Sequence, residues 1–94
     1  MIGDDLMGDF LPVGTVVLLE NATKKLMVVG YLPRENGKKE TYDYSSVLFP
    51  EGLIDSRRII MFNNNQVKEI CHESLMDEEV KRVLGQVLQV KEEI

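Results

Sequence analysis

The spacing of apolar residues changes at about residue 75, and this change most constrains the fold. Beyond it, apolar residues are separated by four, three, four, three and four positions, at Met76, Val80, Val83, Val87, Val90 and Ile94. Such a heptad spacing places them along one face of a helix, and Leu84 and Leu88 widen that face on one side. The sequence therefore predicts an amphipathic helix over about 75–92.

The start of this helix and the surface that it covers are separate questions. Ser74 is predicted to cap the helix, and the acidic residues at 77–79 favour the positive end of a helix dipole. The apolar face is wider than a two-stranded coiled coil needs. This width is explained in one of two ways. The helix covers an open side of the chain's own sheet, or it projects in part and docks on a partner or on its copy in a homodimer.

Short runs rich in β-branched residues precede the helix. They predict strands at about 13–20, 25–32, 41–49, 58–62 and 67–73, separated by turn signals such as "NAT", Asn36-Gly37 and "PEG". Residues 1–9 are predicted to be a flexible lead-in and residues 10–94 a single domain. The predicted fold class is α+β: a small curved antiparallel sheet or an SH3-like five-stranded barrel, followed by the C-terminal amphipathic helix.

The stretch "NNNQ" at 63–66 separates the last two predicted strands. Asparagine accepts left-handed backbone angles and bonds its own backbone, so a one-turn helix at a corner between strands is the simpler interpretation. A polar cluster at Asn63–Asn65 that contacts a ligand is the alternative.

Charge and cysteine content exclude several classes of protein. A formal net charge of -5 without a dense Lys/Arg cluster argues against nucleic-acid binding. Cys71 is the only cysteine, so an intrachain disulfide is impossible, and its apolar surroundings predict a small buried residue. No signal peptide or long apolar segment is recognisable, so we expect a cytoplasmic protein without a membrane interaction.

The sequence contains no recognisable catalytic, cofactor-binding or metal-binding constellation. His72 is the only histidine, and strand alternation predicts that its side chain and that of Cys71 point to opposite faces. Nucleotide-binding glycine motifs are absent from the sequence. Tyr42 and Tyr44 are predicted to share one strand face, where they form either an aromatic recognition surface or part of the core. We therefore expect no enzyme and no cofactor.

Three stretches stand in order within residues 10–75: "LPVGTVVLLENATKKLMVVGYLP", "YDYSSVLFPEG" and "FNNNQVKEI". Together they resemble a small family from Gram-positive bacteria that is catalogued as a numbered domain of unknown function. The resemblance implies a genomic setting beside type VII secretion systems and their LXG toxins, and hence an accessory role in handling those toxins. It supplies no catalytic residues.

These observations together predict a non-enzymatic adaptor or chaperone that binds a toxin or a small helical protein of a type VII secretion pathway. The alternative is an immunity protein that neutralises a toxin domain with its acidic surface. The candidate partner-binding residues are apolar positions of the predicted helix and two aromatic positions of the third strand: Val80, Val83, Leu84, Val87, Val90, Tyr42 and Tyr44.

Overall fold

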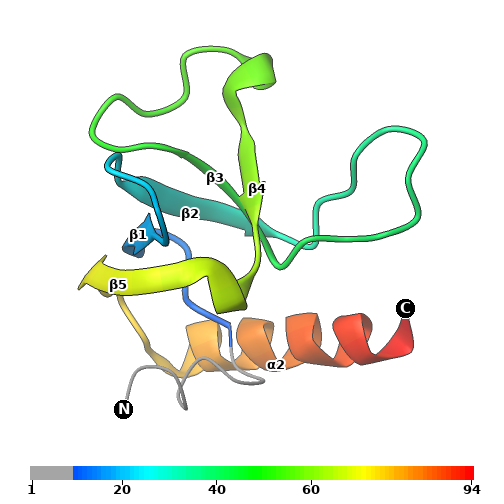
Figure 1. Ribbon diagram of the computed structural model, residues 1–94. Coiled ribbons are helices and arrows are strands. Elements are labelled where there is room, and N and C mark those ends of the chain that lie inside the picture. Colours follow the sequence, from blue (N-terminus) through cyan, green and yellow to red (C-terminus); the bar gives the residue numbers. More distant parts are fainter. Residues whose placement is uncertain (1–9) are drawn as a thin grey trace.

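The computed structural model describes residues 10–94 and shows five antiparallel strands followed by one α-helix (Figure 1). The strands are β1 (Val16–Leu19), β2 (Leu26–Tyr31), β3 (Tyr44–Leu48), β4 (Ile60–Phe62) and β5 (Val67–His72). Two one-turn 3-10 helices, η1 (Ser56–Arg58) and η2 (Asn64–Gln66), precede β4 and β5, and the α-helix is α2 (Glu78–Glu93). The α+β class is thereby confirmed.

The strands form one curved sheet in the order β4-β3-β2-β1-β5. The central strand β2 pairs with both β1 and β3, and its register shifts between Val28 and Gly30, which marks a bulge that bends the strand. Within residues 10–94 no pairing joins β4 to β5, so the sheet stays open. Of the two predicted arrangements, the structure is the small curved sheet with its two edges left unjoined.

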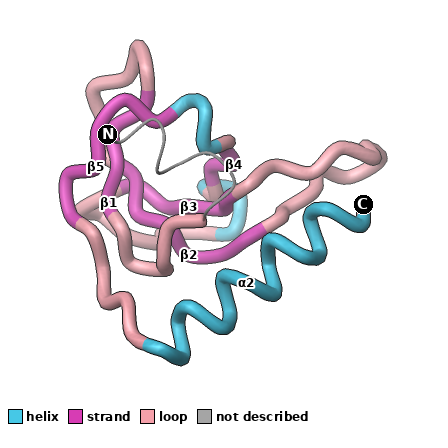
Figure 2. The backbone as a smooth tube through the Cα atoms, turned by 90° about the horizontal axis from the view of Figure 1, so that it is seen from below, coloured by secondary structure: helices cyan, strands magenta, loops and turns pink. Residues whose placement is uncertain are grey.

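The helix α2 lies across one open side of the sheet (Figures 1 and 2). Leu84, Val87 and Leu88 pack against the buried core from this side, and each remains partly exposed. This contact supports the interpretation that the helix covers the chain's own sheet. Other apolar residues of the helix, such as Val83 and Val90, remain exposed, so the contact with the sheet uses only part of the apolar face.

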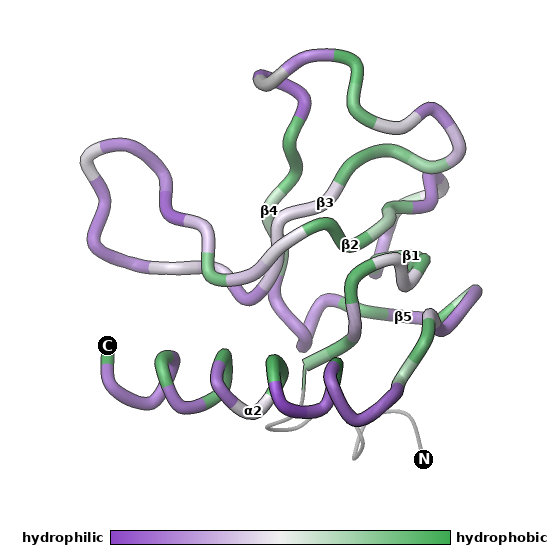
Figure 3. The backbone as a smooth tube through the Cα atoms, turned by 180° about the vertical axis from the view of Figure 1, so that it is seen from behind, coloured by the Kyte–Doolittle hydropathy of each residue, from purple (hydrophilic) through white to green (hydrophobic). Residues whose placement is uncertain are grey.

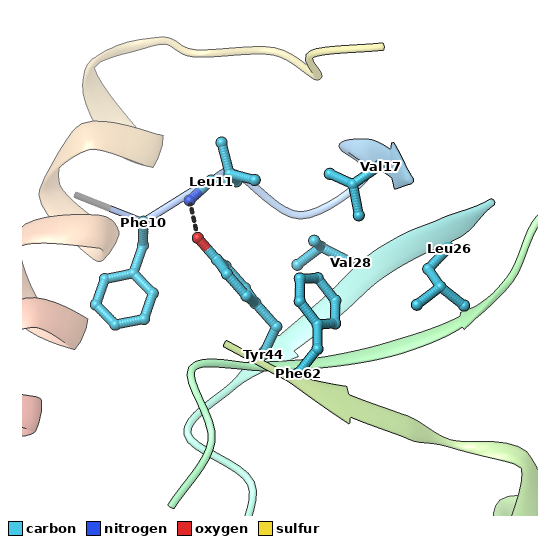
Figure 4. Close-up of a cluster of buried hydrophobic side chains, with 7 residues drawn as sticks. All are labelled: Phe10, Leu11, Val17, Leu26, Val28, Tyr44 and Phe62. Atoms are coloured by element: carbon cyan, nitrogen blue, oxygen red, sulfur yellow. Dashed lines mark hydrogen bonds between the residues drawn. The ribbon is translucent and has the colours of Figure 1, made fainter. Parts of the chain in front are cut away.

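The core lies between α2 and the concave side of the sheet and is rich in aromatic residues. Tyr44 and Phe62 are fully buried, and their ring centroids lie 4.9 Å apart. The ring of Phe10 packs edge-on against that of Tyr44, and Figure 4 shows Phe10 and Phe62 on either side of the Tyr44 ring. Val17 on β1 and Val28 on β2 belong to the same core cluster. Inward positions on adjacent strands thus supply one continuous apolar cluster.

All five strands are shorter than their predicted ranges, and in two of them polar side chains compete for the backbone. The predicted strand 41–49 begins only at Tyr44, since the N–H of Asp43 donates to Asn63 Oδ1 at 2.8 Å instead of continuing a ladder. The predicted strand 58–62 begins at Ile60, because Asp55 accepts from the backbone N–H of Arg57 and caps η1.

The predicted helix start at 75 and the predicted cap at Ser74 are wrong. The helix begins at Glu78, and the side chain of Asp77 accepts from the N–H of Val80 at 2.9 Å. The N–H of Ser74 instead donates to Thr15 Oγ1 at 3.3 Å. This bond ties the segment before the helix to the turn before β1.

The predicted one-turn helix at "NNNQ" is confirmed as η2. The N–H of Asn63 donates to Gln66 Oε1 at 2.8 Å, and the N–H of Gln66 donates to the carbonyl of Asn63 at 3.0 Å. The predicted turn between β1 and β2 is also present, with Asn21 at a φ of 62°.

Candidate functional site

An open groove with a volume of about 390 Å³ lies between the first half of α2 and the segment that precedes β1. Pro12 and Val13 form one side, Val80 and Val83 the other, and Leu75 lies at the end where the helix begins. Val13 is 52% exposed and Leu75 is 69% exposed, although both are apolar. The groove therefore presents unpaired apolar side chains to solvent.

The groove continues into a set of exposed apolar residues on and beside α2, here called the apolar flank: Val83 and Val90 on the helix, Met76 before it and Ile94 at its C-cap. Val83 and Val90 are 43% and 46% exposed, and they are seven residues apart, so they share one side of the helix. Figure 3 shows apolar positions recurring along α2 between hydrophilic ones. The heptad face is thus divided into a part that packs on the sheet and a flank that does not.

The five helix positions predicted to bind a partner fall into three groups. Val83 and Val90 lie on the apolar flank, and Val80 is half-buried in the wall of the groove. Leu84 and Val87 pack against the chain's own core, although Leu84 also contacts the groove. Val83 and Val90 are therefore exposed and Val80 lines the groove, whereas Leu84 and Val87 contribute to the packing of the helix on the sheet.

Tyr44 is not available as an aromatic anchor, because its side chain is fully buried. Its hydroxyl accepts from the N–H of Leu11 at 2.8 Å and donates to Asn64 Oδ1 (Figure 4 shows the first bond). Burial in the core raises the pKa of this phenol well above its usual range. The core interpretation is therefore correct for Tyr44.

Tyr42 lies outside the strands, in the segment between β2 and β3, and is half-buried. Its hydroxyl donates to Glu35 Oε1 at 2.9 Å. This hydrogen bond, together with the charge of Glu35, raises the pKa of the Tyr42 hydroxyl. The two tyrosines consequently do not form the shared aromatic face that alternation predicts.

Asp43 joins three distant parts of the chain, and sequence analysis did not identify it. One carboxylate oxygen, Oδ2, accepts from the N–H of Asn64 at 2.8 Å, and the other lies 2.7 Å from Nζ of Lys91 near the end of α2. Nζ of Lys91 also lies 5.5 Å from the centroid of the Phe10 ring. The Asn63 side chain accepts from the N–H of Asp43, and the Asn64 side chain accepts from the Tyr44 hydroxyl. Both side chains are thus used inside the fold, which favours the structural interpretation of the asparagine corner.

A second hollow, of about 540 Å³, lies over β1, β2 and β5 and includes Val16, Lys25, Cys71 and His72. Cys71 is exposed, so the prediction of a buried thiol is wrong. The pairing of β1 with β5 shifts register between Val16 and Val17, opposite His72 and Ile70, which leaves Cys71 as the extra residue of a bulge. The bulge interrupts the alternation of side chains along β5. Cys71 and His72 therefore line the same hollow instead of pointing to opposite faces of the sheet.

Two further properties bear on the kind of site that the chain can form. Within residues 10–94, no three His, Cys, Asp or Glu side chains are grouped so that they could hold a metal ion. No helix in this described part is sufficiently long and apolar to cross a membrane.

The fold and the groove define a small α+β domain with an exposed apolar surface. The chain belongs to the DUF4176 family, a domain of unknown function, whose family model matches residues 10–83. The match includes every residue that lines the groove except Leu84, and it ends before Val90 and Lys91. Neither the curated proteins nor the solved structures contain a significant match to the chain.

Proposed function

We propose that this protein is a non-enzymatic cytoplasmic adaptor or chaperone that binds a toxin or another small protein of a type VII secretion pathway. The observation that carries the proposal is the groove beside Val13 and Val83, together with the apolar flank that extends from it. The secretion setting rests on the family resemblance of the sequence.

The apolar flank favours protein binding for a thermodynamic reason. Removing apolar surface from water contributes about 25 cal/mol per Å², and central apolar side chains supply much of the affinity at protein interfaces. Val83 and Val90 are about half exposed and therefore still have apolar area to bury. They are presented by a helix whose opposite side is fixed by Leu84 and Leu88, so docking on them requires no unfolding.

The test is co-purification of the tagged chain from cells that carry the native secretion locus. The variant Val83→Gln with Val90→Gln replaces two apolar side chains on the flank with good helix formers. The control variant, Leu53→Gln with Ile54→Gln, removes two apolar residues that are also exposed but lie in the segment between β3 and β4. We expect a toxin or small secretion protein to be lost from the first variant and retained by the second.

Circular dichroism and thermal unfolding of both variants show whether the fold is intact. A partner that remains bound to the folded flank variant would place the interface elsewhere, and the absence of any partner from the wild-type chain would remove support for an adaptor.

The immunity protein is a second candidate, and the acidic residues at the start of α2 beside the groove favour it. Co-expression with the isolated toxic domain separates the two functions. An adaptor is expected to leave toxicity unchanged and to alter export, whereas an immunity protein restores growth.

A further inference from the structure

The outer border of the apolar flank carries acidic and amide side chains. Glu79, Gln86 and Glu93 follow one another at intervals of seven residues on α2, and Gln86 and Glu93 each follow a flank position, Val83 or Val90, by three residues. Residues three apart are neighbours on a helix surface, so these side chains form a row parallel to the flank on α2. Glu79 also lines the groove.

The acids of this row are not neutralised within the part of the chain that the structure describes. The ion pairs among residues 10–94 include neither Glu79 nor Glu93. Of the basic residues on α2, Lys81 pairs with Glu78, and Lys91 pairs with Asp43 on the side facing the sheet. Arg82 follows Glu79 by three residues and borders the row on its solvent side, but it forms no ion pair with Glu79 in the described part of the chain.

On the inner side of the flank, Val87 packs against the core, and Val80 lines the groove that Val83 also borders. A segment that docks along the whole flank therefore extends over the outer side of the helix and lies beside the acidic row. Its apolar residues meet Val83 and Val90, while its edge lies against Glu79 and Glu93. Charge complementarity at that edge requires lysine or arginine.

A second copy of the chain fits this surface poorly. If two α2 helices packed antiparallel through their flanks, the acidic row would face itself, with Glu79 opposite Glu93 of the second copy. If they packed parallel, the acidic first turns, each carrying Glu78 and Glu79, would lie side by side. Like charges at such positions are destabilising, and each chain carries a formal charge of -5.

We infer that the segment docking on the apolar flank is a partner's amphipathic helix whose apolar stripe is bordered by lysine or arginine. This inference rests on the proposed adaptor function and specifies the chemistry of its partner. The flank supplies the burial of apolar surface, and Glu79 and Glu93 select the sign of the partner's charge.

The probes are two labelled helical peptides of about 20 residues with the same leucine and alanine stripe. In one peptide the stripe is bordered by lysine, and in the other by glutamate. Fluorescence anisotropy at low and high salt measures their binding to the full chain. We expect the lysine peptide to bind at least about tenfold more tightly at low salt, and salt to reduce this preference.

Matched variants test the acidic row. The variant Glu79→Gln with Glu93→Gln is expected to weaken lysine-peptide binding about three- to tenfold. Its control, Glu78→Gln with Glu92→Gln, removes one acid from each of the same two turns but away from the flank, and is expected to change binding by less than about twofold. Val83→Gln with Val90→Gln is expected to weaken binding of both peptides.

Equal affinity for the two peptides, or no effect of Glu79→Gln with Glu93→Gln, would overturn the inference. A dimer in sedimentation equilibrium that Val83→Gln with Val90→Gln dissociates would overturn it as well, because a second copy would then occupy the flank. Failure of the adaptor function is a separate result. In that case the lysine peptide binds as expected, while no cellular protein depends on Val83 and Val90.

Discussion

Oδ1 of Asp43 lies 2.7 Å from Nζ of Lys91, which connects the entrance of β3 to the last turns of α2. The Asp43 side chain is 8% exposed, whereas that of Lys91 is 46% exposed. The pair therefore attaches the C-terminal end of the helix to a carboxylate that is itself shielded from solvent. Leu84, Val87 and Leu88 also attach the helix to the core.

Replacing Lys91 with Ala is expected to lower the free energy of unfolding by about 1.5 to 3 kcal/mol, because a hydrogen bond to a shielded charge is lost. The control is Lys81→Ala, which removes an exposed pair with Glu78 and is expected to cost less than about 0.5 kcal/mol. Urea unfolding gives both values. Hydrogen exchange in α2 should increase in the Lys91 variant, and equal effects of the two substitutions would contradict a special role for the Asp43 pair.

Replacing Tyr44 with Phe keeps the ring and removes a hydroxyl that bonds Leu11 and Asn64. The loss leaves buried polar groups without this partner, so the expected cost is about 1 to 3 kcal/mol of unfolding free energy. Tyr42→Phe is the matched control, since it removes a hydroxyl that bonds the Glu35 side chain in a loop, and it should cost less than about 1 kcal/mol. A smaller loss for Tyr44→Phe than for Tyr42→Phe would refute this assignment.

Stability is expected to fall in alkaline solution because of the same phenol. Burial raises the pKa of Tyr44 in the folded chain above its ordinary value of 10.0, so above that pH the unfolded chain has lost a proton that the folded chain keeps. The contribution is thus constant below about pH 10 and decreases as pH rises further. Unfolding free energies measured between about pH 9 and 11 should decrease more steeply for the wild type than for Tyr44→Phe.

The same glycine-to-alanine change is expected to have opposite effects at two positions. Gly85 lies within α2, and a methyl group there meets open space, so Gly85→Ala should stabilise the protein by about 0.5 to 1 kcal/mol. Gly14 has a φ of +96°, and an added Cβ would lie 2.7 Å from Oγ of Ser74. Gly14→Ala should therefore destabilise it by about 1 to 2 kcal/mol. Thermal unfolding of the two variants shows directly whether each substitution raises or lowers the stability of the protein.

Short-range chemistry explains which parts of this fold could be predicted. The heptad spacing that includes Val83 and Val90 predicts the helix, and the "NNNQ" stretch predicts η2. Both signals are local in the sequence and do not depend on tertiary contacts. The start of the helix was misplaced because Ser74 and Asp77 are both good caps, and only the contact of Ser74 with Thr15 decides between them.

The exposed apolar side of the helix was predicted only in part. Periodicity identifies an apolar face on the helix, but the division between Val87, which packs inward, and Val83, which stays exposed, depends on where the sheet lies. Val13 and Asp43 were missed because their roles come from residues distant in the sequence. An apolar residue immediately before the glycine of a turn, as in Val13-Gly14, is a weak signal that could have drawn attention to Val13.

The position of β1 between β2 and β5 has a consequence for synthesis of the chain. Val17 pairs with Leu26, close in sequence, but also with Ile70, which leaves the ribosome much later. The sheet therefore cannot be completed while the first strands emerge, and non-local pairing of this kind slows folding. During translation, Val17 and the neighbouring core residues are expected to stay uncovered until β5 arrives.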